Sequence, residues 1–154
     1  MLDVTISSRA FPSGFDIKTT EGVFSAKKVP LSPTGEIRVL NASANQIARL
    51  ERDGFFSSVY NVIITGGGFY RFGRDASSSQ TWTCKGEGKL FSVSEKKGRK
   101  FLLSEEAQEI AECSKSRFSN RYEVRVFNDA DFKLVMCVFM ALSLLEHQSE
   151  GIPD

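Results

Sequence analysis

The apolar segment over residues 134–145 constrains the fold of this chain more than any other feature. It reads LVMCVFMALSLL, in which Ser143 is the only residue with a hydroxyl group and no residue is charged. A helix on the surface of a globular protein would show an apolar stripe and a polar face, and a membrane-spanning helix needs about 20 apolar residues. Because the segment fits neither class, we predict that residues 132–145 form a central helix surrounded by protein.

The chain before this helix, from Leu2 to Phe127, alternates short strand-like segments with turns. Turn signals such as Pro33-Thr34-Gly35 and Lys97-Gly98 separate the segments, at the spacing of roughly 8–12 residues that is typical of a β-sandwich or β-barrel. The expected strands are 2–6, 15–19, 22–28, 36–41, 46–52, 57–65, 68–74, 79–85, 87–93, 99–103, 107–115 and 120–127.

The clearest alternation lies in the last of these strands. There Tyr122, Val124 and Val126 alternate with charged residues, which places one face on a core and the other in water. The segment 128–131 supplies residues that cap the start of a helix. A sheet closed around the helix covers both apolar surfaces and leaves no exposed edge. We therefore predict a mainly β fold in one domain over residues 1–154: a closed antiparallel barrel of about twelve strands that encloses the C-terminal helix.

Composition excludes several classes of function. Twenty basic and nineteen acidic side chains give a net charge of +1, whereas a dedicated nucleic-acid-binding protein is usually much more basic. The three cysteines, Cys84, Cys113 and Cys137, are widely spaced without a C-x-x-C pair, so we expect free thiols and neither a metal nor another cofactor. The first residues lack the pattern of a secretory signal, and we expect a cytoplasmic protein without a transmembrane segment.

Motifs along the chain resemble a known family. FDIKTTEG at 15–22 leads into GVFSAKKV, GEIRVL at 35–40 leads into QIARLER, and Tyr60-Asn61-Val62 precedes LFSV at 90–93. EIAECSKS at 109–116 is followed by YEVRV at 122–126, an acidic residue at 131 and the apolar helix, which is the most specific part of the order. In these features the chain resembles the tubby-like barrel superfamily, and within it the LURP-one-related proteins, over roughly residues 15–147.

The resemblance implies a twelve-stranded barrel around a central hydrophobic helix, in agreement with the strand pattern. Tubby proteins bind phosphoinositides, and the phospholipid scramblases share related sequence features. The resemblance therefore implies an anionic phospholipid as a candidate ligand, and a peripheral membrane location when that ligand is bound.

The densest cluster of charge is the segment 96–100. Lys96, Lys97, Arg99 and Lys100 surround Gly98, and such a cluster can meet the phosphate groups of a lipid head group. The alternative is a solvated hairpin tip whose charges protect the sheet from aggregation, which the near-neutral net charge favours. Both interpretations stay open, and these four residues are the candidate anion-binding or lipid-binding site.

Catalytic patterns are weak in this sequence. Gly66-Gly67-Gly68 lacks the spacing of a phosphate loop, and His147 is the only histidine, so it cannot form a histidine-based metal site alone. We expect the carboxylates between 105 and 112 to lie on a turn and on the solvent-facing side of a strand. We predict no catalytic residue and a non-enzymatic binding or scaffold module with a phospholipid or protein partner on the barrel exterior. The alternative is an enzyme whose residues gather on the barrel loops.

Overall fold

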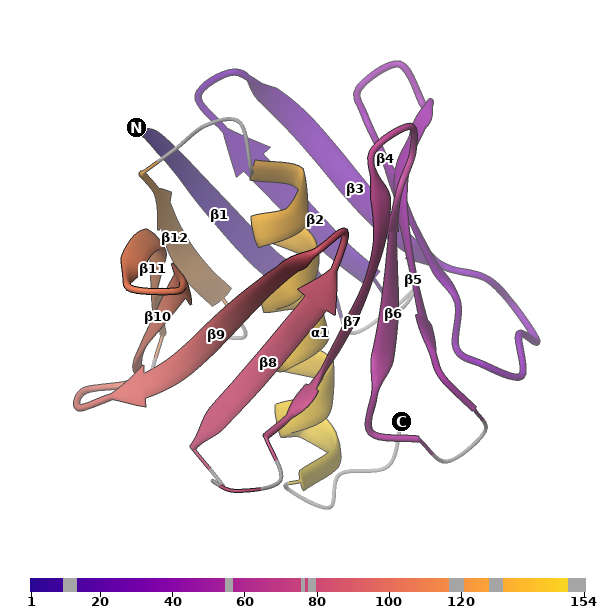
Figure 1. The fold of residues 1–154 in the computed structure, drawn as a ribbon. Helices are drawn as coiled ribbons and strands as arrows, with labels where there is room; N and C mark the ends of the chain where they lie inside the picture. Colours follow the sequence, from indigo (N-terminus) through magenta and orange to yellow (C-terminus); the bar gives the residue numbers. More distant parts are fainter. Residues whose placement is uncertain are drawn as a thin grey trace.

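Twelve β-strands and one α-helix make up the described part of the chain in this computed structural model (Figure 1). The structure describes residues 1–9, 14–54, 57–75, 77, 80–116, 121–127 and 132–149; for Arg9 and residues 147–149 it describes the backbone alone. The elements are β1 (Leu2–Arg9), β2 (Gly14–Thr19), β3 (Gly22–Lys28), β4 (Ile37–Leu40), β5 (Gln46–Arg52), β6 (Tyr60–Ile64), β7 (Gly68–Arg74), β8 (Thr81–Gly86), β9 (Lys89–Lys96), β10 (Lys100–Glu105), β11 (Gln108–Lys115), β12 (Arg121–Val126) and α1 (Phe132–Ser149).

The strands form a closed antiparallel barrel in which each strand pairs with its neighbours in sequence. Closure comes from β1 and β12, where Leu2 pairs with Val126 and Ile6 pairs with Tyr122. The helix α1 runs through the middle of the barrel (Figure 1). The predicted fold, a closed barrel of about twelve strands around a C-terminal helix, is confirmed.

Most strand boundaries lie within a few residues of their predicted positions. The strand predicted over 57–65 is shorter and spans Tyr60–Ile64; just before it, the carbonyl of Val59 accepts a hydrogen bond from the Asp53 N–H at 2.8 Å. The strand predicted over 87–93 runs on to Lys96, which pairs directly with Lys100. The helix cap predicted at 128–131 lies outside the described residues.

The helix is buried on all sides, as its sequence predicts. Val135, Val138, Phe139 and Leu142 point in different directions around the helix, and each is at most 1% exposed. Leu134 and Leu145, towards its two ends, are 6% and 7% exposed. Burying one such side chain contributes about 1.5–3 kcal/mol, so the helix provides a large share of the core.

The barrel has two distinct ends. At one end α1 begins, and the ring of Phe132 lies 5.7 Å from the ring of Phe24. At the other end Glu146 accepts a hydrogen bond from Tyr122 near the end of α1. We call this second end the helix-exit end; β1, β3, β5, β7, β9 and β11 finish there, at the lower side of Figure 1.

Candidate functional site

The basic turn predicted from the sequence joins β9 to β10 at the helix-exit end. Lys96 and Lys100 pair across the hairpin, so Lys97, Gly98 and Arg99 form the turn itself. All four basic residues are exposed, and within the described residues none of their side chains forms an ion pair. Like charges directly opposite one another destabilise a hairpin, so the structure keeps unpaired positive charge at this tip.

The backbone of the turn gives no separate signal of function. Arg99 has a φ of 62° beside Gly98 at 78°, and a non-glycine residue is uncommon in this left-handed region. Glu87 and Glu106, in the hairpins at the opposite end, have φ values of 53° and 54°. The conformation is therefore a property of these short turns, and the candidate site depends on the charges.

Strand pairing reveals further cations at the same end. Paired residues form rows across the inner wall, and one row runs from Arg52 through Tyr60 and Phe72 towards β10. The strands of a barrel are staggered, so a row of paired residues climbs from one end of the barrel to the other as it crosses successive strands. Each row begins at the helix-exit end, on the last inward-facing residue of one strand. These positions are Ser8, Lys28, Arg52, Arg74, Glu95 and Lys115, and Lys115 N–H donates to the carbonyl of Arg99.

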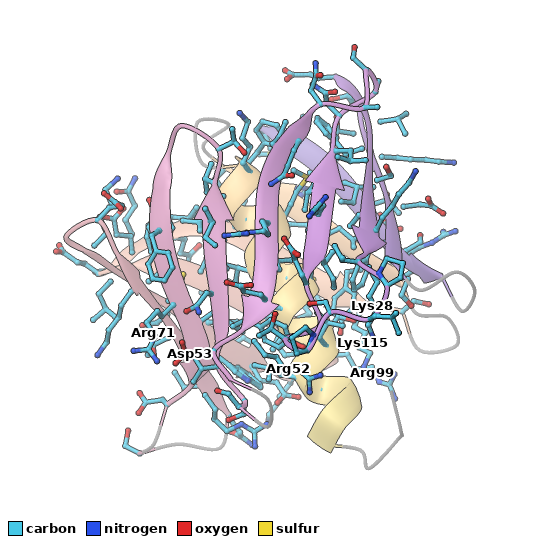
Figure 2. The ribbon with its side chains drawn as sticks, turned by 90° about the vertical axis from the view of Figure 1, so that its right-hand side faces the viewer. Lys28, Arg52, Asp53, Arg71, Arg99 and Lys115 are labelled. Atoms are coloured by element: carbon cyan, nitrogen blue, oxygen red, sulfur yellow. The ribbon has the colours of Figure 1, made fainter. Side chains whose placement is uncertain are left out.

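The opposite end of the barrel has a different charge. The same rows finish there at Ile64, Tyr70, Glu105, Leu2, Thr19 and Phe24, which include one acid and no Lys or Arg. The excess of inward-facing positive charge is therefore confined to the helix-exit end. We call Lys28, Arg52, Arg74, Arg99 and Lys115 the rim cations; Figure 2 shows four of them towards the end of α1.

Three other arginines do not join the basic turn. Arg49 and Arg71 face outward and bind acids: Arg49 Nη1 lies 3.4 Å from Glu36 Oε1, and Arg71 binds Asp53. Arg121 also faces outward, and its Nη1 lies 3.9 Å from the Glu123 carboxylate. Arg52 and Arg74, by contrast, lie at the end that carries the basic turn.

Two of the rim cations are held over aromatic rings. The Arg74 guanidinium lies 5.4 Å from the ring centre of Trp82, and Lys115 Nζ lies 5.9 Å from that of Tyr122. Such contacts contribute about 0.5–1 kcal/mol at exposed positions. They fix where the charges stand without neutralising them.

The end of α1 is attached to the barrel wall by a polar cluster. The Tyr122 hydroxyl donates to Glu146 Oε1 at 2.6 Å, and Lys115 Nζ lies 3.8 Å from the same oxygen. Burial, together with the Glu146 carboxylate, raises the pKa of Tyr122 above its ordinary range. Tyr122 therefore stays a hydrogen-bond donor, and the cluster positions the helix end while it partly neutralises Lys115.

Arg52 differs from the other rim cations because it is half buried and its side chain has no partner among the described residues. Its Nε is buried without a hydrogen bond, and no hydrogen bond or ion pair of its side chain is formed within the described residues. A buried donor without an acceptor costs about 1–3 kcal/mol. Within the described residues, the fold therefore keeps the Arg52 Nε–H without an acceptor at a free-energy penalty.

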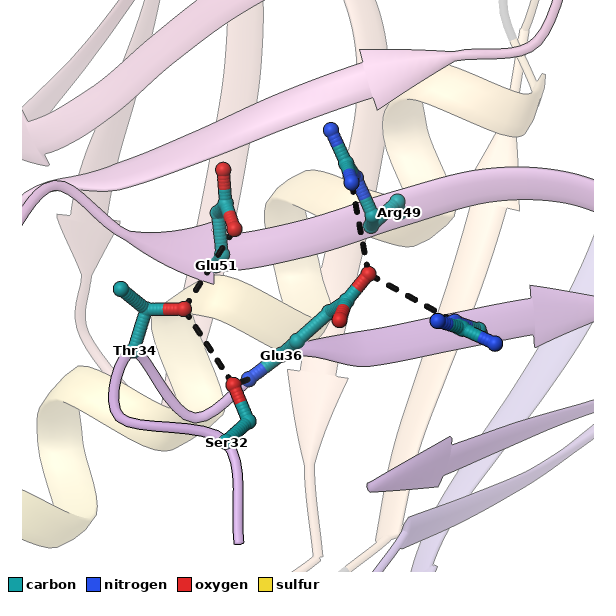
Figure 3. A network of polar contacts seen from close by, with 6 residues as sticks. Ser32, Thr34, Glu36, Arg49 and Glu51 are labelled. Atoms are coloured by element: carbon teal, nitrogen blue, oxygen red, sulfur yellow. Dashed lines mark hydrogen bonds and ion pairs between the residues drawn. The ribbon is translucent and has the colours of Figure 1, made fainter. Parts of the chain in front are cut away.

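The acids nearest to Arg52 in sequence are engaged on the outer wall. Glu51 Oε2 accepts from the Thr34 hydroxyl at 3.4 Å, in a network with Ser32 and Glu36 that Figure 3 shows. Asp53 binds Arg71 and accepts from Asn61 at 3.1 Å. Alternation along β5 and into Asp53 sends these carboxylates away from the barrel axis, so neither of them serves as a counter-charge for Arg52.

Apart from Arg99, the rim cations did not stand out as a cluster in the sequence, because they come from four strands that lie far apart along the chain. A signal was nevertheless present: a basic residue follows the last buried residue of a strand by two positions. These pairs are Ala26 and Lys28, Leu50 and Arg52, Phe72 and Arg74, and Cys113 and Lys115.

The three cysteines are free and buried inside the barrel. Burial raises the pKa of Cys84 and Cys137 to about 12, and burial with nearby carboxylates raises that of Cys113. Because the thiolate is the reactive form, we expect all three to resist a thiol-specific reagent at pH 8 in the native protein and to react after denaturation. Absorbance of the released thiol product measures this, and rapid reaction of any cysteine before unfolding would contradict the buried positions.

Within the described residues, no group of three or more His, Cys, Asp or Glu side chains is arranged to hold a metal ion. Among the same residues, no helix combines the length and apolar character needed to cross a membrane.

Comparisons with known proteins find a match at the level of the fold alone. No protein-family model and no curated protein sequence matches this chain. The structure is similar to the X-ray structure of a protein from Arabidopsis thaliana, with a TM-score of 0.64, 13% sequence identity, and coverage of 96% of this chain and 91% of that chain. At this identity the likeness shows a shared fold.

Proposed function

We propose that this chain is a non-enzymatic binding module that docks reversibly on anionic phospholipid with its helix-exit end. The observation that carries the proposal is the unpaired basic turn, Lys96, Lys97, Arg99 and Lys100, on the end where the rim cations also gather. A net charge of +1 for the whole chain makes this end a local patch of positive potential, which suits contact with a charged surface in one orientation.

We also propose that the chain belongs to the tubby-like superfamily, near the LURP-one-related proteins. The closed barrel around an apolar C-terminal helix supports this, as does the order of sequence motifs that ends in the Tyr122–Val126 strand and the helix. In that family a phospholipid is an expected ligand, which agrees with the charge at the helix-exit end.

The expected strength of docking follows from the charges. A Lys or Arg near an anionic membrane surface contributes about 1 kcal/mol, so the four residues of the turn together contribute roughly 4 kcal/mol at low salt. This corresponds to weak, reversible binding, and salt screens it because the charges are exposed. The cytoplasmic leaflet, which carries the anionic lipids of a cell membrane, is the proposed location.

Removing the charge of the basic turn should abolish docking. With Lys96, Lys97, Arg99 and Lys100 all replaced by Gln, we expect binding to phosphatidylserine vesicles to fall by about a hundredfold or more, since most of the roughly 4 kcal/mol is lost. Vesicle flotation at low salt measures the bound fraction. Thermal stability should be unchanged or slightly higher, because the replaced side chains are exposed and the like-charge pair Lys96–Lys100 is removed.

A matched variant controls for net charge. Replacing Lys18, Lys85, Lys89 and Lys133 by Gln removes the same charge towards the opposite end of the barrel, and this variant should still bind. Equal loss in both variants would contradict docking through the helix-exit end. Wild-type protein that ignores vesicles but is retained by an acidic protein surface would replace the lipid proposal with a protein partner.

A further inference from the structure

The Arg52 guanidinium is positioned by the backbone instead of by a charge partner. A Cβ at Gly35 would lie 3.5 Å from Arg52 Nη2 and 3.6 Å from Nε, so the guanidinium packs where Gly35 has no side chain. Gly35 has a φ of +63°, a conformation that glycine adopts without strain. The Arg52 N–H also donates to the carbonyl of Thr34 at 2.9 Å, which fixes β5 against this loop.

The charge of each other arginine whose side chain is described is either paired with an acid, stacked on an aromatic ring or exposed to solvent. Arg38, Arg49, Arg71, Arg121 and Arg125 bind acids on the outer wall. Arg74 stacks on Trp82, and Arg99 is exposed. Arg52 combines a fixed, half-buried position with the absence of a counter-charge among the described residues, which is the arrangement of a guanidinium that receives an anion from outside the chain.

Neighbouring strands add positive charge beside Arg52. Lys28 on β3 and Arg74 on β7 occupy the adjacent inward-facing positions along the rim. Each lies two strands from β5, about 10 Å away across the sheet, and the Arg74 guanidinium is held over the Trp82 ring on β8, so the two cations add positive potential beside Arg52 without touching it. Figure 2 shows Lys28 and Arg52 on the same side of the barrel, near the end of α1.

The negative end of the helix dipole does not account for these cations. That end is equivalent to about half an elementary charge, and Lys115 already lies beside the Glu146 carboxylate at the end of α1. Lys28, Arg52 and Arg74 therefore exceed what the helix needs, and Glu95, the next inward-facing rim position after Arg74, offsets one of these three charges. A singly charged carboxylate would balance Arg52 alone, whereas a doubly charged oxyanion would use the flanking cations as well.

We propose that Arg52, flanked by Lys28 and Arg74, binds a phosphate group at the helix-exit end. The terminal N–H groups of Arg52 donate to two phosphate oxygens, the geometry for which a guanidinium is suited, and the flanking cations neutralise the remaining charge. This inference goes beyond surface docking, because it assigns recognition of one compact oxyanion to one positioned side chain. It does not require that the protein bind a membrane.

Nitrogen-15 NMR tests the site on the whole chain, with inorganic phosphate as the probe at constant ionic strength. We expect the buried Arg52 Nε–H to exchange with water more slowly than those of exposed arginines, which separates its signal from theirs. We expect this signal to shift and saturate with phosphate, and Arg52→Lys to weaken phosphate binding about tenfold because the forked donor pair is lost. Arg125→Lys, at an outer-wall arginine paired with Asp3, should bind as the wild type does.

Two outcomes would overturn the inference: an Arg52 signal that does not move with phosphate, or equal weakening by Arg52→Lys and Arg125→Lys. The first needs only wild-type protein, so the test survives even if a variant folds poorly. Vesicles that contain a phosphorylated inositol lipid then identify the source of the phosphate. Weaker binding of Arg52→Lys to these vesicles indicates a lipid head group, whereas an effect on inorganic phosphate alone indicates a soluble ligand.

Discussion

Val138→Asp is expected to prevent folding altogether. Val138 lies in the middle of α1 and is 0% exposed, so an aspartate there places a carboxylate among apolar side chains with no partner. The penalty for a buried, unpaired charge is several kcal/mol, which is comparable to the whole stability of a domain, about 5–15 kcal/mol. Circular dichroism during thermal unfolding should show no cooperative transition.

The same substitution on the outer wall provides the control. Val23 on β3 is 55% exposed, and Val23→Asp should keep a cooperative transition with a loss below about 1 kcal/mol, since the carboxylate stays in water. A Val138→Asp protein that melts cooperatively would contradict an enclosed helix.

Phe139→Ala is expected to give the second-largest effect, about 3–5 kcal/mol of lost stability. Phe139 is 0% exposed within the barrel, and alanine leaves a cavity that the closed wall cannot fill by collapsing. The protein should remain folded but unfold at lower urea concentration, with an unchanged slope of free energy against denaturant.

Phe69 provides a matched control for this change. It lies on the outer face of β7 and is 47% exposed, so Phe69→Ala should cost roughly 1 kcal/mol or less. Equal losses at Phe69 and Phe139 would mean that the helix does not form the centre of the core.

The fold could be predicted from the sequence because two strong patterns agree. The apolar segment 134–145 requires cover on all sides, and the period-two alternation at Tyr122, Val124 and Val126 provides an apolar wall. No local feature of Leu2–Ile6 indicates which strand it pairs with. Closure between β1 and β12 was predicted only because an apolar helix and an apolar sheet face together require a closed barrel. Strand ends depend on hydrogen bonds between segments that the sequence pattern does not show, such as the one from Asp53 N–H to the Val59 carbonyl.

The candidate site was predicted only where its residues adjoin in sequence. The basic turn at 96–100 stands out by local density, whereas Lys28, Arg52 and Arg74 come together through the stagger of the barrel. The missing partner of Arg52 is a property of three dimensions, because Glu51 and Asp53 are adjacent in sequence and yet face outward. The attachment of Glu146 to Tyr122 likewise depends on where the helix leaves the barrel.

Co-sedimentation of the wild-type chain with vesicles tests the central claim, docking through charge, most directly. The comparison uses neutral phosphatidylcholine vesicles and phosphatidylserine vesicles at about 0.1 M and about 1 M salt, where the Debye length falls from about 10 Å to about 3 Å. We predict binding to the anionic vesicles at the lower salt, and loss of that binding at the higher salt or with neutral lipid. Binding that ignores head-group charge and salt, or no binding to either vesicle, would contradict the claim.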